Sequence, residues 1–186
     1  KWENAMSQLY VRIMEEYLLF PAKFYQSDSE VWGNVASILS TLPDITSVFL
    51  SYTQSVPAIT TEQLSWYSNI AAVLLAKGQW DTDEQAIQLC KCFAEIGHKL
   101  AETMYSPEML TTENLHLLPS GYRFSWYLKQ AMEAIQTNHL AECVPVLRAA
   151  LKTAPIYNKA VHVLLDYVSA HNASPELLAL ADRVRG

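Results

Sequence analysis

Apolar residues recur every three to four positions along most of this chain, which is the spacing of amphipathic α-helices. Prolines, glycines and helix-capping residues separate the segments that carry this spacing. The predicted helices span about residues 2–20, 28–42, 43–55, 61–77, 81–105, 122–137, 140–153, 156–170 and 174–184. Short helical turns are predicted over 107–118, and a non-helical turn is predicted at 119–121. The pattern therefore predicts an all-α protein.

The helix predicted over 61–77 has clear signals at both ends. Thr60 and Gln63 have the Thr-x-x-Gln spacing of a capping box, in which side chains satisfy free backbone N–H groups of the first turn. Gly78 follows the last turn, and glycine tolerates the left-handed conformation that commonly ends a helix. These signals predict a helix from Thr61 to Lys77.

Composition agrees with a folded helical chain and narrows the classes of partner. Of the 186 residues, 51% are hydrophobic and 17% are charged, which suits a sizeable core and is too apolar for disorder. The formal net charge of −6 argues against nucleic acid as a partner, because nucleic-acid binding needs a basic surface. No apolar run reaches the roughly 18 residues of a membrane span. We therefore expect neither a nucleic-acid partner nor a membrane span.

The three cysteines are Cys90, Cys92 and Cys143, and their odd number and spacing fit no disulfide framework. We expect reduced, buried or partly buried thiols in the cytoplasm. Side chains two residues apart on a helix point about 200° away from each other. The Cys90 and Cys92 thiols therefore cannot coordinate the same metal ion.

Residues 124–157 have the pattern of a helical hairpin with small residues where its two helices cross. The positions that match are Tyr127, Ala131, Asn138, Leu140, Cys143, Leu147, Ala150 and Pro155. Alanine or cysteine at three of them lets the helices approach closely, and Asn138 tolerates a left-handed conformation between them. The positions that depart from the pattern are Gln130, Ala134 and Pro145. The segment thus resembles one tetratricopeptide repeat, a helical hairpin of about 34 residues.

The same register extends weakly in both directions. A further unit starts at Asn158, and an earlier one starts at Cys90 with the first-helix pattern Phe93-x-x-Ile96-Gly97-x-x-Leu100. The resemblance implies one all-helical domain over 1–186, built of antiparallel hairpins stacked in a right-handed superhelical array. Its parts are irregular helices in 1–60, degenerate repeat hairpins in 61–121, and a repeat with a C-terminal cap in 122–186.

Two Glu-x-x-His pairs are candidates for metal binding, because residues three apart share one face of a helix. They are Glu95 with His98 and Glu113 with His116, and only 18 residues separate them, with Pro107 in between. Two long antiparallel helices do not fit in that gap, so we expect solvated side chains and no metal. The sequence also contains no nucleophile elbow and no Gly-rich phosphate loop. No catalytic residue and no cofactor is therefore predicted.

The resemblance implies a non-catalytic module that binds a peptide or protein partner, or that scaffolds a larger protein. In that family the first helix of each unit lines the inner, concave face of the array. The corresponding residues are Ser125, Leu128, Lys129, Met132, Ile135, Lys159, His162 and Asp166. The alternative is that neighbouring helices cover Leu128 and Met132.

Two other hypotheses remain open. The chain begins at Lys1 without a methionine, and helices similar to tetratricopeptide repeats often follow the catalytic domain of bacterial glycosyltransferases. The second hypothesis is therefore a C-terminal accessory domain of such a larger enzyme. The third is a helical metal-binding protein, and it rests on the two Glu-x-x-His pairs alone.

The repeat register makes a prediction about three alanines. Ala131 and Ala150 mark close helix contacts, so replacing either with Leu should overpack the crossing and destabilise the protein by about 1–3 kcal/mol. Ala141, near the turn, should tolerate Leu within about 0.5 kcal/mol. Urea midpoints of the three variants test the contrast, since helix propensity alone predicts equal effects. Equal midpoints, or the largest loss for Ala141→Leu, would show that the register is wrong.

Overall fold

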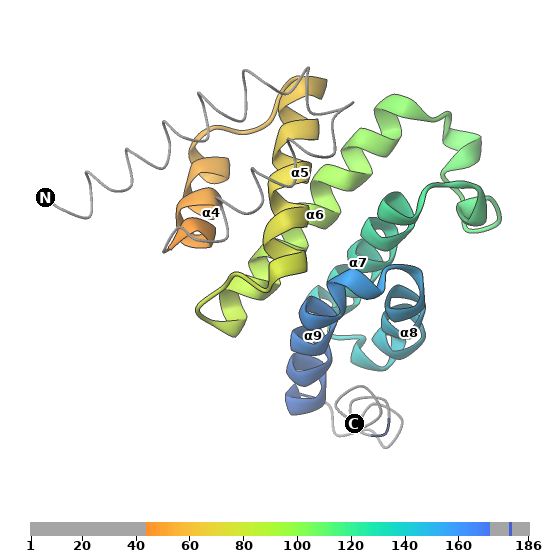
Figure 1. Ribbon diagram of the computed structural model, residues 1–186. Coiled ribbons are helices and arrows are strands. Elements are labelled where there is room, and N and C mark those ends of the chain that lie inside the picture. The colour runs from red at the N-terminus through yellow and green to blue at the C-terminus, as the bar shows by residue number, and fades with distance from the viewer. Residues whose placement is uncertain (1–43, 172–178, 180–186) are drawn as a thin grey trace, which may run out of the picture.

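The computed structural model describes residues 44–171 and 179, and throughout this part of the chain every regular element is helical. The α-helices are α4 (Ile45–Ser55), α5 (Thr61–Lys77), α6 (Asp83–Met104), α7 (Ser120–Gln136), α8 (Cys143–Thr153) and α9 (Asn158–His171) (Figure 1). Short 3-10 turns lie between them, at η2 (Pro107–Met109), η3 (Leu115–Leu117), η4 (Leu140–Glu142) and η5 (Pro155–Tyr157). The helices predicted over 2–20, 28–42 and, except for residue 179, 174–184 lie outside the described residues. For the rest, the all-α prediction is confirmed.

The capping and reversal residues identified in the sequence form the corresponding helix ends in the structure. Thr60 accepts a hydrogen bond from the Gln63 backbone N–H at 3.1 Å, and the Gln63 side chain accepts one from the Thr60 N–H at 3.1 Å, which completes the capping box. Gly78 ends α5 with φ of 67°, and Asn138 follows α7 with φ of 58°. Both are left-handed conformations, as predicted, and both let the chain reverse between antiparallel helices.

Two boundaries differ from the prediction. The turn predicted at 119–121 is wrong, because α7 begins at Ser120 and the Pro119 carbonyl accepts from the N–H groups of Tyr122 and Arg123. Serine and glycine are tolerated there, since first-turn N–H groups need no partner within the helix. The helix predicted from 140 begins at Cys143, after the 3-10 turn η4. Pro145 then falls in the first turn of α8, where its missing N–H costs nothing.

Consecutive helices from α5 to α8 run antiparallel and pack side by side, and α9 then returns to contact α5, α6 and α8 (Figure 1). Helix α6 also contacts α4 and α7. It therefore touches four other helices, and nine of its residues are buried. The hydrophobic core of the described residues is built around α6.

Helix α4 is attached to the rest by its aromatic residues and by two hydrogen bonds. Tyr67 in α5 packs edge-on against both Phe49 and Tyr52, with ring centroids 6.2 and 6.0 Å apart. The Tyr67 hydroxyl donates to the Val56 carbonyl at 2.6 Å, just after α4 ends. The buried Thr46 donates to the Gln79 carbonyl in the turn between α5 and α6. The predicted helix over 43–55 is thus confirmed and is held by side chains of α5 and its following turn.

Helices α6 and α7 approach each other closely where they cross at Gly97. A Cβ atom placed on Gly97 of α6 would lie 2.5 Å from the Oγ of Ser125 and 2.6 Å from its Cβ. Such distances are shorter than any ordinary van der Waals contact, so only glycine fits at this position. Ser125 is 2% exposed, and its hydroxyl donates to the Tyr122 carbonyl at 2.9 Å. The small residue that the repeat pattern placed at position 97 therefore does allow two helices to approach closely.

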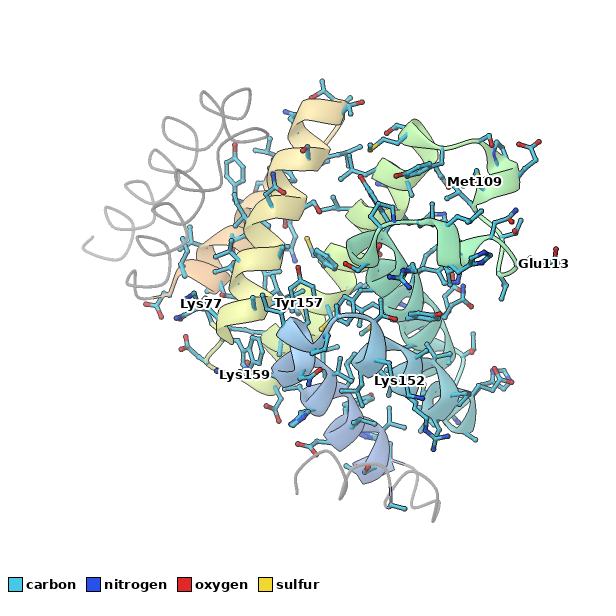
Figure 2. All side chains as sticks on the ribbon, turned by 45° about the vertical axis from the view of Figure 1, so that its right-hand side comes forward. Lys77, Met109, Glu113, Lys152, Tyr157 and Lys159 are labelled. Carbon is cyan, nitrogen blue, oxygen red and sulfur yellow. The ribbon has the colours of Figure 1, made fainter. Side chains whose placement is uncertain are left out.

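Three aromatic rings join α9 to the same crossing. Tyr157, in the turn η5, packs against Phe124 of α7 with ring centroids 4.7 Å apart and against Phe93 of α6 at 5.7 Å. Phe93 and Phe124 are 6.1 Å apart and are both buried. Figure 2 shows Tyr157 where the start of α9 meets α5 and α6. This cluster fixes where the chain re-enters the bundle and so directs α9 back along α5 and α6.

The contacts of α9 differ from those expected in the predicted superhelical array. In a simple stack of hairpins, each hairpin contacts only its neighbours. Here α9 follows the hairpin of α7 and α8, yet it also contacts α5 and α6 of the hairpin before. The described residues therefore establish antiparallel helical hairpins, whereas the superhelical stack belongs to the proposal made below.

Two glycines offer a matched test of the α6–α7 crossing. Gly97→Ala should destabilise the protein by about 1–3 kcal/mol, because the new methyl group overlaps Ser125. Gly121→Ala, in the first turn of α7, meets nothing within 4 Å and should stabilise by up to about 1 kcal/mol through helix propensity. Urea unfolding followed by circular dichroism measures both. If Gly97→Ala stabilises as Gly121→Ala does, α6 and α7 do not approach each other this closely.

Candidate functional site

A groove of about 250 Å³ lies directly over the crossing of α6 and α7. Its floor is the face of α6 that carries Phe93, Gly97 and Leu100. One wall is α5, and the other is the beginning of α7 together with Tyr157 of η5. Because Gly97 has no side chain, Ser125 of α7 packs directly against it at the edge of the groove. The groove therefore borders the same close contact that organises the core.

The α5 wall carries a stripe of small polar residues, at Ser65, Ser68, Asn69 and Ala72. Their spacing of three and four residues places them on one face of the helix. All four are half-buried, while Leu64, Ile70 and Leu75 of the same helix point into the core. Among the described residues, the side chains of the two serines and Asn69 have no hydrogen-bond partner. Two hydroxyls and one amide therefore line this wall with free donors and acceptors.

The opposite wall is aromatic. The Tyr122 hydroxyl lies 2.9 Å from the Met104 sulfur, and its ring packs edge-on against Tyr105 with centroids 5.7 Å apart. Burial raises the pKa of Tyr122, and the neighbouring Tyr105 raises it further. Burial also raises the pKa of Tyr157. Both phenols therefore stay neutral at physiological pH, and every side chain along the groove is uncharged.

The structure places four of the predicted binding residues largely inside the protein. Leu128 is 0% exposed and Met132 is 8% exposed, so neighbouring helices cover both, as the alternative interpretation held. Ile135 is half-buried and packs against the core. Ser125 is also buried, but it lies at the edge of the groove described above. It is the one predicted residue that the groove includes.

The other predicted residues are spread over two separate regions. Lys129 of α7 faces Glu133, with its Nζ 3.8 Å from a carboxylate oxygen. Lys159 at the start of α9 lies against Gly78, on the side of the molecule where Lys77 ends α5 (Figure 2). His162 and Asp166 follow on α9 and are half-buried. Because α9 returns to α5, its residues Lys159, His162 and Asp166 lie apart from the predicted residues of α7. The eight predicted residues therefore form no single surface.

Some of the groove residues that were not predicted as binding residues had a recognisable signal in the sequence. The stripe Ser65, Ser68, Asn69 and Ala72 is uncharged and interrupts an otherwise apolar helix at helical spacing. Tyr157 gave no such signal, because its place in the groove depends on how η5 packs against Phe93 and Phe124.

The two Glu-x-x-His pairs lie apart from each other. His98 of α6 is 2.8 Å from a carboxylate oxygen of Glu102, while Glu95 is exposed. His116 and Glu113 are exposed in and beside η3. Among the described residues, no three His, Cys, Asp or Glu side chains come close enough to hold a metal ion.

The three cysteines are unpaired, and Cys90 and Cys143 are completely buried. Burial raises the pKa of the Cys90 thiol to about 12 and that of Cys143 to about 11. Cys92 is half-buried, and its pKa is raised to about 12 by burial and by the charge of Glu95, against a smaller opposing effect of a hydrogen bond with Thr53. The expectation of buried or partly buried thiols is confirmed, and none of the three is a reactive thiolate at neutral pH.

Compared with family models, with curated proteins and with solved structures, the chain has no significant match. Within the described residues, no helix combines the length and the apolar character that crossing a membrane requires.

The thiols give a prediction for chemical labelling. In the native protein at pH 8, iodoacetamide should leave Cys90 and Cys143 unmodified, because neither is accessible and both are protonated. Cys92 should react slowly, and all three should react after denaturation in guanidinium. Mass spectrometry of proteolytic peptides measures each site. Rapid native labelling of Cys90 would contradict its burial beneath neighbouring helices.

Proposed function

We propose that this chain is a non-catalytic helical-repeat module that binds an uncharged peptide segment in the groove between α5 and α7. The observation that carries the proposal is the groove itself, which combines an apolar floor with a wall of unpaired hydroxyl and amide groups. In this proposal the segment belongs to a protein partner or to a larger parent chain.

The groove chemistry fits a peptide better than a charged ligand. Ser65, Ser68 and Asn69 can exchange hydrogen bonds with the N–H and C=O groups of a peptide backbone. Phe93 and Leu100 offer the floor on which a small apolar side chain would lie. Without a charged lining residue, the groove has no group to compensate the desolvation of an ionic side chain. The proposal therefore commits to a neutral, short segment.

Several features support the tetratricopeptide-like part of the proposal. Asn138 has the left-handed conformation expected between the two helices of a unit. Ala131 and Ala150 are both 0% exposed, and the buried Cys143 sulfur is 3.6 Å from the Ala131 carbonyl oxygen. Ala141 is exposed. In the proposed register the first helices of successive units start at Cys90, Phe124 and Asn158, which belong to α6, α7 and α9. The groove therefore lies beside the crossing of two first helices, α6 and α7.

A groove-filling substitution tests the proposal. Peptides selected from a random displayed library against the purified protein should bind saturably, and Ser68→Trp should weaken that binding at least about tenfold by occupying the groove. Ser51→Trp is the matched control, because Ser51 is an exposed residue of α4 outside the groove. Fluorescence anisotropy of labelled peptides measures the affinities, and circular dichroism checks that both variants fold.

Two outcomes would count against the proposal. One is a selection that yields no saturable peptide. The other is a set of peptides whose affinity is equal for the wild type, for Ser68→Trp and for Ser51→Trp, because such peptides bind elsewhere.

A further inference from the structure

A second pocket, of about 380 Å³, lies on a different side of α7 from the groove. Residues of α7, η3 and α8 surround it, chiefly Arg123, Trp126, Tyr127 and Gln130 from α7, His116 from η3, and Val146 from α8. Its size falls in the range of small-molecule sites, about 300–1,000 Å³. None of its lining residues belongs to the groove between α5 and α7.

Arg123 is the residue that points to a ligand. Its Nε is buried, and it has no hydrogen-bond partner among the described residues. A buried donor without a partner is costly, and a guanidinium group has five N–H donors in a planar fork. A ligand in the pocket would instead meet the terminal N–H groups of the fork, and a carboxylate binds such a pair of donors in bidentate geometry.

The charge of the pocket favours the same ligand. The chain carries a net charge of −6, yet none of the described residues that line this pocket is acidic. Besides Arg123, His116 adds ring nitrogens that can take part in hydrogen bonds. Gln130 supplies an amide that can donate to the second carboxylate oxygen. In the described residues, no carboxylate forms an ion pair with Arg123.

The rest of the pocket is apolar and aromatic. Trp126 and Tyr127 present ring surfaces, and Leu115 and Val146 complete the lining. The Trp126 ring is supported by His98, whose ring centroid lies 6.1 Å away. His98 is itself held by Glu102 at 2.8 Å. An aromatic ring attached to the carboxylate would therefore pack against Trp126, whose position is fixed by its contact with His98.

We propose that this pocket binds a small organic monocarboxylate with an aromatic body, whose carboxylate pairs with Arg123 while its ring packs against Trp126 and Tyr127. The site is separate from the peptide groove, so either proposal can fail without the other.

Phenylacetate is the probe, and its neutral isostere phenylacetamide is the matched ligand control. Isothermal titration calorimetry on the full chain should show saturable binding of phenylacetate, and phenylacetamide should bind at least about tenfold more weakly. Arg123→Gln should weaken phenylacetate binding by a similar factor. Lys129→Gln removes the same formal charge from α7 but lies outside the pocket, and it should leave the affinity unchanged.

Gln130→Leu is measured in parallel and should also weaken phenylacetate binding, so the test does not depend on one variant folding. Thermal melting followed by circular dichroism establishes that each variant is folded. The proposal is overturned if phenylacetate shows no saturable binding, if phenylacetamide binds equally well, or if Lys129→Gln weakens binding as much as Arg123→Gln does.

Discussion

The contact on which the rest of this structure depends is the crossing of α6 and α7 at Gly97 and Ser125. The Ser125 side chain occupies the space that a Cβ on Gly97 would need. This lets α7 lie directly on α6, which also contacts α4, α5 and α9. Once α7 is placed, Phe124 and Phe93 form the surface that receives Tyr157. That ring in turn determines where α9 starts and why it runs back along α5 and α6.

The same crossing leads to the proposed function. While α7 packs closely against α6, a groove lies between α7 and α5, and its floor is the face of α6 that carries Phe93, Gly97 and Leu100. The α5 wall of this space has hydroxyl and amide groups that are free in the described residues, which is unusual beside an otherwise apolar helix. The pocket at Arg123 lies on another face of α7 and has the opposite character, with a cation that lacks a partner. One helix would thus separate a neutral site from an anion-binding one.

Much of the fold within the described residues followed from local signals. Caps such as Thr60 and reversals such as Gly78 and Asn138 act within one or two turns, so the sequence alone contains their cause. The predicted start of α7 was wrong, because Ser120 and Gly121 have the composition of a turn. The first turn of a helix also tolerates these residues. The binding surface could not be read from the repeat register, because Leu128 and Met132 are buried in α7, which packs against α6 on one side of the chain and α8 on the other. The packing of one helix against another decides which apolar face is covered, and the periodicity within a single helix does not encode it.

The most direct test of the central claim is a nuclear Overhauser spectrum of isotope-labelled protein. If α6 and α7 cross as described, the Gly97 α-protons give strong cross-peaks to the Ser125 β-protons, because the two groups are in van der Waals contact. A spectrum in which Gly97 contacts solvent or another helix, with no cross-peak to Ser125, would contradict the crossing and the groove that depends on it.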